Sequence, residues 1–190
     1  MNYLLPDGGV IVRQHEVPGR SRRTIWVDYE DPALADTAVS MHVEASGPIV
    51  AERAMWWPGS SDSWIGGHAS LGATNAAARW GVAGLVAGGM AHAEPWVLVA
   101  NPAETPTTVR MTLLFNDGRS PVIADYPVAA RSRLTIAVGW WHPETADSSF
   151  GAIVEQLGAP TGIVVESAVY QDSNGVVWAA GRGGLATPIP

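Results

Sequence analysis

The chain has 190 residues, of which 47% are apolar and 15% charged, a balance that favours a folded core over disorder. It contains no cysteine, which excludes disulfides and thiolate metal sites, and its 11 basic residues are all arginine. The net charge of −7 argues against a nucleic-acid partner, because phosphate binding needs a basic surface. No apolar run is long enough to span a membrane, and the first residues lack the pattern of a signal peptide, so we expect no membrane insertion.

Short runs rich in Val, Ile, Thr and Trp alternate with Gly, Pro, Asn and Asp along the chain, which is typical of β-strands and turns. Asp7-Gly8, Asp117-Gly118 and Asn174-Gly175 indicate hairpins, because these pairs tolerate positive φ. Residues 151–157 are the best helical candidate, but they are few and rich in Val and Ile, so we predict a strand. The predicted strands are residues 10–16, 24–29, 39–45, 49–57, 96–101, 107–115, 120–128, 134–138, 150–157 and 163–171.

The sequence also repeats itself, because residues 3–8 resemble 113–118, 20–27 resemble 131–138, and 48–54 resemble 162–168. The offset between the copies grows slowly, as small insertions in loops would produce. Residues 79–108 have no counterpart in the first copy. The sequence therefore predicts an all-β protein of two tandem β-sandwich units, the first lacking its N-terminal strands. We place these units at 1–76 and 77–190, and expect the open sheet edge of the first to promote homo-oligomers.

Glu52 and Glu166 are the strongest polar signal, because each lies inside an apolar strand where an unpaired carboxylate is costly. Arginines at 20, 22, 131 and 133 are candidate partners, since arginine binds carboxylates through two parallel hydrogen bonds. One interpretation is a structural ion pair in each unit. The other is a binding or acid–base carboxylate, with an aromatic residue, Trp56 or Tyr170, four positions later on the same strand face.

The nine tryptophans are several times the ordinary number for a chain of this length. Trp56-Trp57 and Trp140-Trp141 are adjacent pairs, and neighbours on a strand point to opposite faces. We therefore expect one member of such a pair to reach the surface or an interface. There it either packs against another subunit or stacks on a sugar or another flat ligand.

Histidines are few, and none lies in a His-X-His or His-Glu-X-X-His pattern, so we expect no metal. His68 lies in a glycine-rich loop or short strand near Asp62, and the second unit has Arg182 in its place. His68 is either a hydrogen-bonded structural residue or, with Glu52 and Asp62, part of a site in the first unit alone. Walker loops and nucleophile elbows are missing, so the sequence predicts no cofactor.

Several ordered motifs carry a resemblance to known families: residues 2–8, 17–24, 27–32, 48–57 and 97–102. Over nearly the whole chain they resemble an uncharacterised bacterial extracellular family of tandem repeats. About half of each unit more distantly resembles the sensory rhodopsin transducer superfamily. The resemblance implies an oligomeric β-sandwich that binds sugars or other small molecules, in an extracellular setting, and it implies no catalytic residues.

These observations leave three functional hypotheses. The first is a non-catalytic β-sandwich module that binds carbohydrate or another small ligand in an extracellular repeat array. Its site would comprise Trp56, Trp57, Trp64, Glu52, Arg53 and His68, and in the second unit Glu166, Tyr170 and Arg182. The second is a hydrolase in which Glu52 acts with His68 or Asp62 as an acid–base pair. The third is a structural spacer that self-associates.

Overall fold

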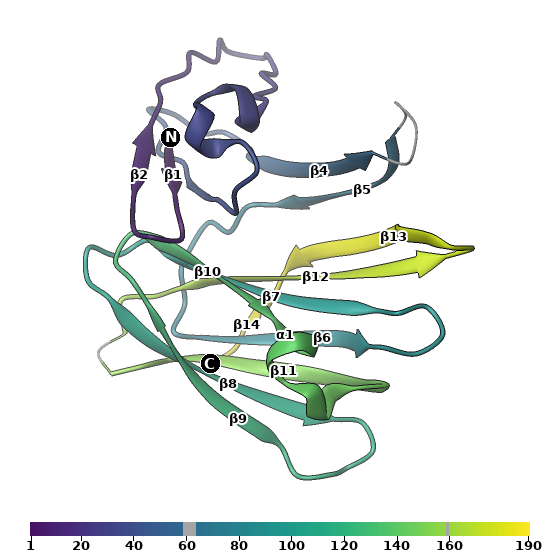
Figure 1. The fold of residues 1–190 in the computed structure, drawn as a ribbon. Coiled ribbons are helices and arrows are strands. Elements are labelled where there is room, and N and C mark those ends of the chain that lie inside the picture. The colour runs from purple at the N-terminus through teal and green to yellow at the C-terminus, as the bar shows by residue number, and fades with distance from the viewer. Residues whose placement is uncertain (59–63, 159) are drawn as a thin grey trace.

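The protein is built almost wholly from β-strands in a computed structural model that describes residues 1–58, 64–158 and 160–190 (Figure 1). This confirms the prediction of an all-β fold. The helical elements are short: α1 (Val138–Trp141), η1 (Val27–Tyr29), η2 (Pro32–Leu34) and η3 (Pro143–Thr145). Within the described ranges, none of the helices has the length and apolar character needed to cross a membrane.

The C-terminal region contains two antiparallel sheets with strand orders β10-β7-β12-β13 and β14-β6-β11-β8-β9. A single cluster of buried apolar side chains, including Trp80, Val97, Met111, Phe150 and Val165, draws on both sheets, as in a β-sandwich. The strands are β6 (Arg79–Ala87), β7 (Glu94–Asn101), β8 (Thr107–Phe115), β9 (Val122–Val128), β10 (Ser132–Ala137), β11 (Ser148–Leu157), β12 (Val164–Ser173), β13 (Val176–Leu185) and β14 (Thr187–Pro188).

The N-terminal region contains a three-stranded sheet of order β2-β1-β3 and a separate hairpin formed by β4 and β5. Its strands are β1 (Asn2–Leu4), β2 (Val10–Val12), β3 (Ser40–His42), β4 (Glu52–Pro58) and β5 (Trp64–Leu71). The β4–β5 hairpin packs through β5 against β13 of the C-terminal region, and Figure 1 shows it lying over the β12–β13 hairpin. The two hairpins thus bring together segments that the repeat relates by sequence.

Matching features recur in the two regions in the same order. The sheet order β2-β1-β3 corresponds to β9-β8-β11, and the β4–β5 hairpin corresponds to β12–β13. Three turn positions have positive φ in both regions: Gly8 and Gly118, Arg20 and Arg131, Asp36 and Asp147. The boundary between residues 76 and 77 stays a prediction.

The predicted turns and several strands agree with the structure. All three Asp-Gly or Asn-Gly pairs lie between paired antiparallel strands, and residues 151–157 belong to β11. The strand predicted at 24–29 is wrong, because residues 27–29 form η1. The corresponding residues of the second copy are 135–140, of which 135–137 end β10, paired with β7, and 138–140 belong to α1. The N-terminal sheets contain no strand equivalent to β7 among the described residues, so residues 24–26 have no such partner, whereas the turn at 27–29 is common to both copies.

The predicted strands do not include β5 and β13, because glycines interrupt both. The structure shows why these glycines are needed. A Cβ at Gly66 would lie 2.4 Å from the ring of Trp57, and a Cβ at Gly183 would lie 2.4 Å from the ring of His68. Bare backbone at these positions allows aromatic rings to lie directly on the strands.

Candidate functional site

The β4–β5 hairpin has two chemically different faces. Met55 pairs with His68 across the hairpin, so these two side chains share a face with Arg53 and Trp57. This inner face packs on the β12–β13 hairpin. Trp56 and Glu52 belong to the outer face, which is open to solvent, and the side chain of Trp56 is 56% exposed. The two adjacent tryptophans therefore point in opposite directions, as alternation along a strand predicts.

Aromatic side chains from both hairpins meet on the inner face. The ring of Trp57 lies edge-on to that of Tyr170, with centroids 5.2 Å apart, and its Nε1–H donates to the carbonyl of Trp178 at 2.6 Å. Tyr170 in turn stacks on Trp178 at 4.9 Å. His68 Nε2 lies 3.4 Å from the hydroxyl of Tyr170. We define the inter-hairpin cluster as these aromatic residues and the polar groups beside them: Trp57, His68, Tyr170, Trp178, Arg53, Ser70 and Glu166.

The inter-hairpin cluster also contains an ion pair between the two hairpins. Arg53 Nη2 lies 3.0 Å from Glu166 Oε2, and the hydroxyl of Ser70 donates to Glu166 Oε1 at 3.4 Å. Burial lowers the pKa of His68 below its usual value, and the positive charge of Arg53 lowers it further, whereas Glu166 raises it. Burial likewise raises the pKa of the Tyr170 phenol. The neutral forms of His68 and Tyr170 are therefore favoured in the folded protein.

The structure corrects the predicted partners of the two carboxylates. Glu166 pairs with Arg53 from the other region, whereas Arg131 pairs with Glu104 at 3.3 Å. Arg133 is also buried and donates to the carbonyl of Val39, and burial lowers its pKa to about 10. None of the ion pairs between described residues includes Glu52. The recurring glutamate thus has different surroundings in the two copies.

The proposed acid–base pair is divided between the two faces of the hairpin. Glu52 lies on the outer face, whereas His68 lies on the inner face against Tyr170. The two groups are not positioned to exchange a proton with the same substrate. Asp62, the other candidate partner of Glu52, lies outside the described residues.

A second aromatic group is exposed to solvent. The rings of Trp26 and Tyr29 have centroids 5.5 Å apart, and those of Trp26 and Trp64 are 6.2 Å apart. Trp64 is 54% exposed and Tyr29 is 83% exposed. We call these three residues the exposed aromatic face. It joins residues from η1 and its N-cap to the first residue of β5.

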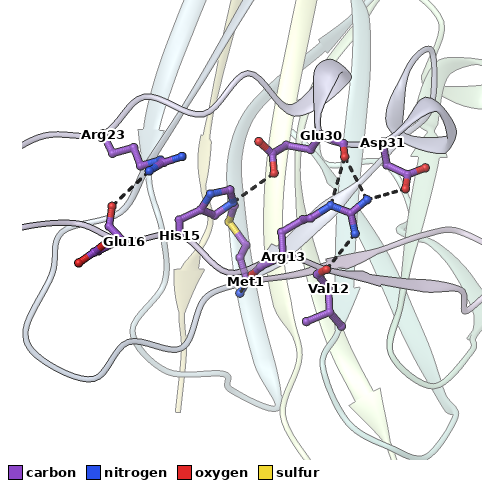
Figure 2. Close-up of polar contacts among 8 residues, drawn as sticks. All are labelled: Met1, Val12, Arg13, His15, Glu16, Arg23, Glu30 and Asp31. Atoms are coloured by element: carbon purple, nitrogen blue, oxygen red, sulfur yellow. Dashed lines mark hydrogen bonds and ion pairs between the residues drawn. The ribbon is translucent and has the colours of Figure 1, made fainter.

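A polar network holds η1 and η2 in place and so positions two of these rings (Figure 2). The guanidinium of Arg13, next to β2, donates to the carbonyl of Glu30 and to Asp31 Oδ2, the latter at 2.7 Å. His15 Nε2 lies 3.2 Å from Glu30 Oε2. Because Glu30 directly follows η1, these contacts fix the segment that carries Trp26 and Tyr29.

Two further groups of polar and aromatic residues lie in the C-terminal region. The buried ring of His142 contacts the hydroxyl of Tyr126, and burial together with Glu144 raises the pKa of Tyr126 to about 12. A shallow cavity of about 190 Å³ is lined in part by Glu94, Trp96 and Trp140. The described residues contain no group of three or more His, Cys, Asp and Glu side chains suited to a metal ion.

The structure thus distributes the predicted site residues over three places. Trp56, Trp64 and Glu52 are exposed on the N-terminal region. Trp57, Arg53, His68, Glu166 and Tyr170 meet in the inter-hairpin cluster. Arg182 faces elsewhere and donates to the carbonyl of Gly84 in β6.

Sequence reasoning missed Trp26, Tyr29 and Trp178 as members of these groups. Trp26 and Tyr29 lie three residues apart, a spacing that places two rings side by side in a helical turn, but the segment was predicted to be a strand. Sequence patterns did not identify Trp178, because Tyr170 meets it across the β12–β13 hairpin and Trp57 reaches it only after the two hairpins pack.

Comparisons with known proteins show a distant fold relationship. No protein-family model matches the sequence, and no curated protein matches it. Among solved structures, Thermotoga maritima 1070 is similar with 12% identity and a TM-score of 0.52, over 61% of this chain and 97% of that one. The Anabaena sensory rhodopsin transducer is similar with 17% identity and a TM-score of 0.40, over 50% of this chain and 97% of that one.

These likenesses concern the fold alone. At 12% identity, the likeness to the Thermotoga protein shows related architecture and carries no residue roles. The TM-score of the transducer is too low to support an inference about this chain. The resemblance to an extracellular repeat family stays a prediction.

Proposed function

We propose that the protein is a non-catalytic binding module whose exposed aromatic face stacks against a carbohydrate. The observation that carries the proposal is the group formed by Trp26, Tyr29 and Trp64, three neighbouring rings that remain open to solvent. Large exposed aromatic side chains are costly to hydrate, and they are commonly used where a ligand with a flat apolar surface is bound. Pyranose rings present such a surface through their axial C–H groups.

A polar group beside the rings supports a sugar over a purely apolar ligand. Glu52 does not supply it, because Glu52 pairs with Leu71 at one end of the β4–β5 hairpin and Trp64 pairs with Pro58 at the other. The Asp28 carboxylate lies beside the ring of Trp26 and accepts from its Nε1–H at 3.4 Å. Carboxylates accept hydrogen bonds from sugar hydroxyls and so orient a stacked ring.

The inter-hairpin cluster supports a structural role for the remaining predicted residues. Trp57 donates to the carbonyl of Trp178, His68 lies against Tyr170, and Arg53 forms an ion pair with Glu166, so each residue has a partner within the protein. We assign them to holding the β4–β5 hairpin, which carries Trp64, against the β12–β13 hairpin.

The proposal is tested by titrating the protein with soluble β-1,4-linked gluco- and xylo-oligosaccharides while recording tryptophan fluorescence. We expect a saturable change in emission that the double variant Trp26→Ala/Trp64→Ala loses, with affinity reduced at least tenfold. Trp140→Ala is the matched control, because Trp140 is 78% exposed but belongs to α1 of the C-terminal region. The proposal fails if no oligosaccharide changes the emission, or if the double variant binds as well as the unaltered protein.

Analysis of the reaction products distinguishes a hydrolase from a protein that only binds the oligosaccharide. If Glu52 acted as an acid–base residue with a partner other than His68, the protein would release reducing ends from these oligosaccharides and Glu52→Gln would stop that release. Our proposal instead expects binding without release of reducing ends, in the unaltered protein and in the variant.

A further inference from the structure

The β4 strand has an open edge at the position where its counterpart in the C-terminal region is paired. β12 lies between β13 and β7, and it pairs with β7 from Val164 opposite Ala100 to Tyr170 opposite Glu94. β4 corresponds to β12 but pairs only with β5 among the described residues. A row of backbone N–H and C=O groups along Glu52–Pro58 is therefore free to bind another strand.

Burial differs at matching positions within and just before the two strands, as expected where a neighbouring strand is missing. Ile49 is 51% exposed, whereas its counterpart Ile163 is fully buried. Met55 is 37% exposed, whereas its counterpart Val169 is 3% exposed. Ile163 and Val169 belong to the core cluster, to which β7 contributes Val97 and Val99.

Side-chain sizes along β4 also suit a strand of the β7 type. In the C-terminal region Ala168 of β12 lies directly opposite Trp96 of β7, so a small residue faces a large one. β4 has Ala54 at the position that corresponds to Ala168. The alternation of β7, with Val97 and Val99 on its buried face, provides the apolar side chains that such a neighbour would bring.

We propose that the open edge of β4 binds, in antiparallel register, an extended segment with the sequence pattern of β7. Backbone hydrogen bonds along β4 supply affinity, and a large aromatic side chain over Ala54 supplies the register, as in other cases of β-strand addition. The partner is thus a β7-type strand from another repeat of this kind, and the site is distinct from the exposed aromatic face.

The test uses the full chain and a labelled synthetic peptide with the sequence of residues 92–104, which contains β7. Fluorescence anisotropy measures binding, and hydrogen exchange locates it. We expect saturable binding that a scrambled peptide does not show, with slower exchange of the β4 amides. Replacing tryptophan by alanine in the peptide, at the position of Trp96, should weaken binding at least tenfold without any change to the protein.

Two protein variants test whether the peptide binds at the open edge of β4. Ala54→Lys places a long charged side chain where the tryptophan should lie, and we expect at least a tenfold loss of affinity. Ala69→Lys is the matched control, because Ala69 pairs with Ala54 on β5 and shares its face, but lies one strand away from the open edge. We expect less than a twofold change for this variant.

Three outcomes would overturn the proposal. The first is absence of peptide binding to the unaltered chain, and the second is equal binding by the two lysine variants. The third is a dimer that Ala54→Lys dissociates and the peptide does not, because the edge would then bind a second copy of β4 instead.

Discussion

The N-terminal and C-terminal regions share a strand order and turn conformations, but they differ sharply in burial. Among the residues whose burial is described, the N-terminal region contributes only Tyr3, Leu4 and Leu34 to the buried apolar set. All the other members lie beyond residue 76. The same region exposes large apolar side chains at positions 12, 17, 26, 29, 43, 49, 50, 55, 56, 64 and 71.

The comparison shows that a repeated pattern of strands does not by itself produce a core. Strands bury side chains only when both sheets are present to cover them, and β6 and β7 have no counterpart in the N-terminal sheets that the structure describes. The β4–β5 hairpin is stabilised instead by contacts with β13. Stability of the N-terminal region therefore depends on the C-terminal region.

The largest expected effect is on stability, and two tryptophan variants test the difference in burial between the regions. Trp80 is 1% exposed, and its Nε1–H donates to the carbonyl of Ile163 at 2.9 Å. Trp80→Ala should lower the free energy of unfolding by about 3–5 kcal/mol, through the cavity left by the ring and the loss of its hydrogen bond. Trp56→Ala, on the exposed face of β4, should change it by less than about 0.5 kcal/mol. Urea denaturation measures both, and equal effects would contradict the difference between the regions.

The next effect concerns the contact between the two hairpins. Trp57→Ala removes the ring contact with Tyr170 and the hydrogen bond to Trp178, at an expected cost of about 2 kcal/mol. Limited proteolysis should then cleave within β4 and β5 before it cleaves β12. Cleavage of both hairpins at the same rate would show that the N-terminal hairpin does not come away separately.

A smaller effect is expected for the ion pair across the same contact. Arg53 and Glu166 are partly exposed, so solvent screens their attraction, and Arg53→Met should cost about 1 kcal/mol. A double-mutant cycle with Glu166→Gln should give a coupling energy of about 0.5–1 kcal/mol. A coupling energy of zero would mean that the pair does not join the two regions in solution.

The smallest effect is a pH dependence due to His68. Because its pKa is lower in the folded protein than in the unfolded chain, the unfolded chain binds the proton more readily. The stability contributed by neutral His68 is present above the unfolded pKa and is lost as the pH falls below it. Between pH 7.5 and 5 the Tm of the unaltered protein should fall more than that of His68→Gln. Parallel pH profiles would exclude His68 as the source.

Local sequence patterns predicted the parts of the fold that local chemistry determines. The Asp-Gly and Asn-Gly turns and the strand at 107–115 follow from backbone preferences and alternation, and both are observed. The glycine-rich strands β5 and β13 and the turn η1 were missed, because each depends on a neighbour far away in the sequence. Gly183, for example, pairs with Ala168 of β12, and the ring of His68 from the other hairpin lies on it.

The candidate site was predictable only in part, for the same reason. Alternation correctly separated Trp56 from Trp57, since that requires no knowledge of tertiary packing. The pairing of Glu166 with Arg53 could not be predicted from the sequence, because the two residues come from different copies of the repeat. The oligomeric state and the domain boundary stay predictions.

The glycines between the two hairpins also bear on how the protein tolerates genetic change. Every amino-acid replacement at Gly66, Gly181 or Gly183 adds at least a Cβ atom, and the nearest ring atom would then be 2.4–2.7 Å away. An aromatic ring can be replaced by another ring of similar shape, whereas glycine is the only residue that has no Cβ atom. A saturation library should therefore find these three positions less permissive than the tryptophans and histidine that lie on them.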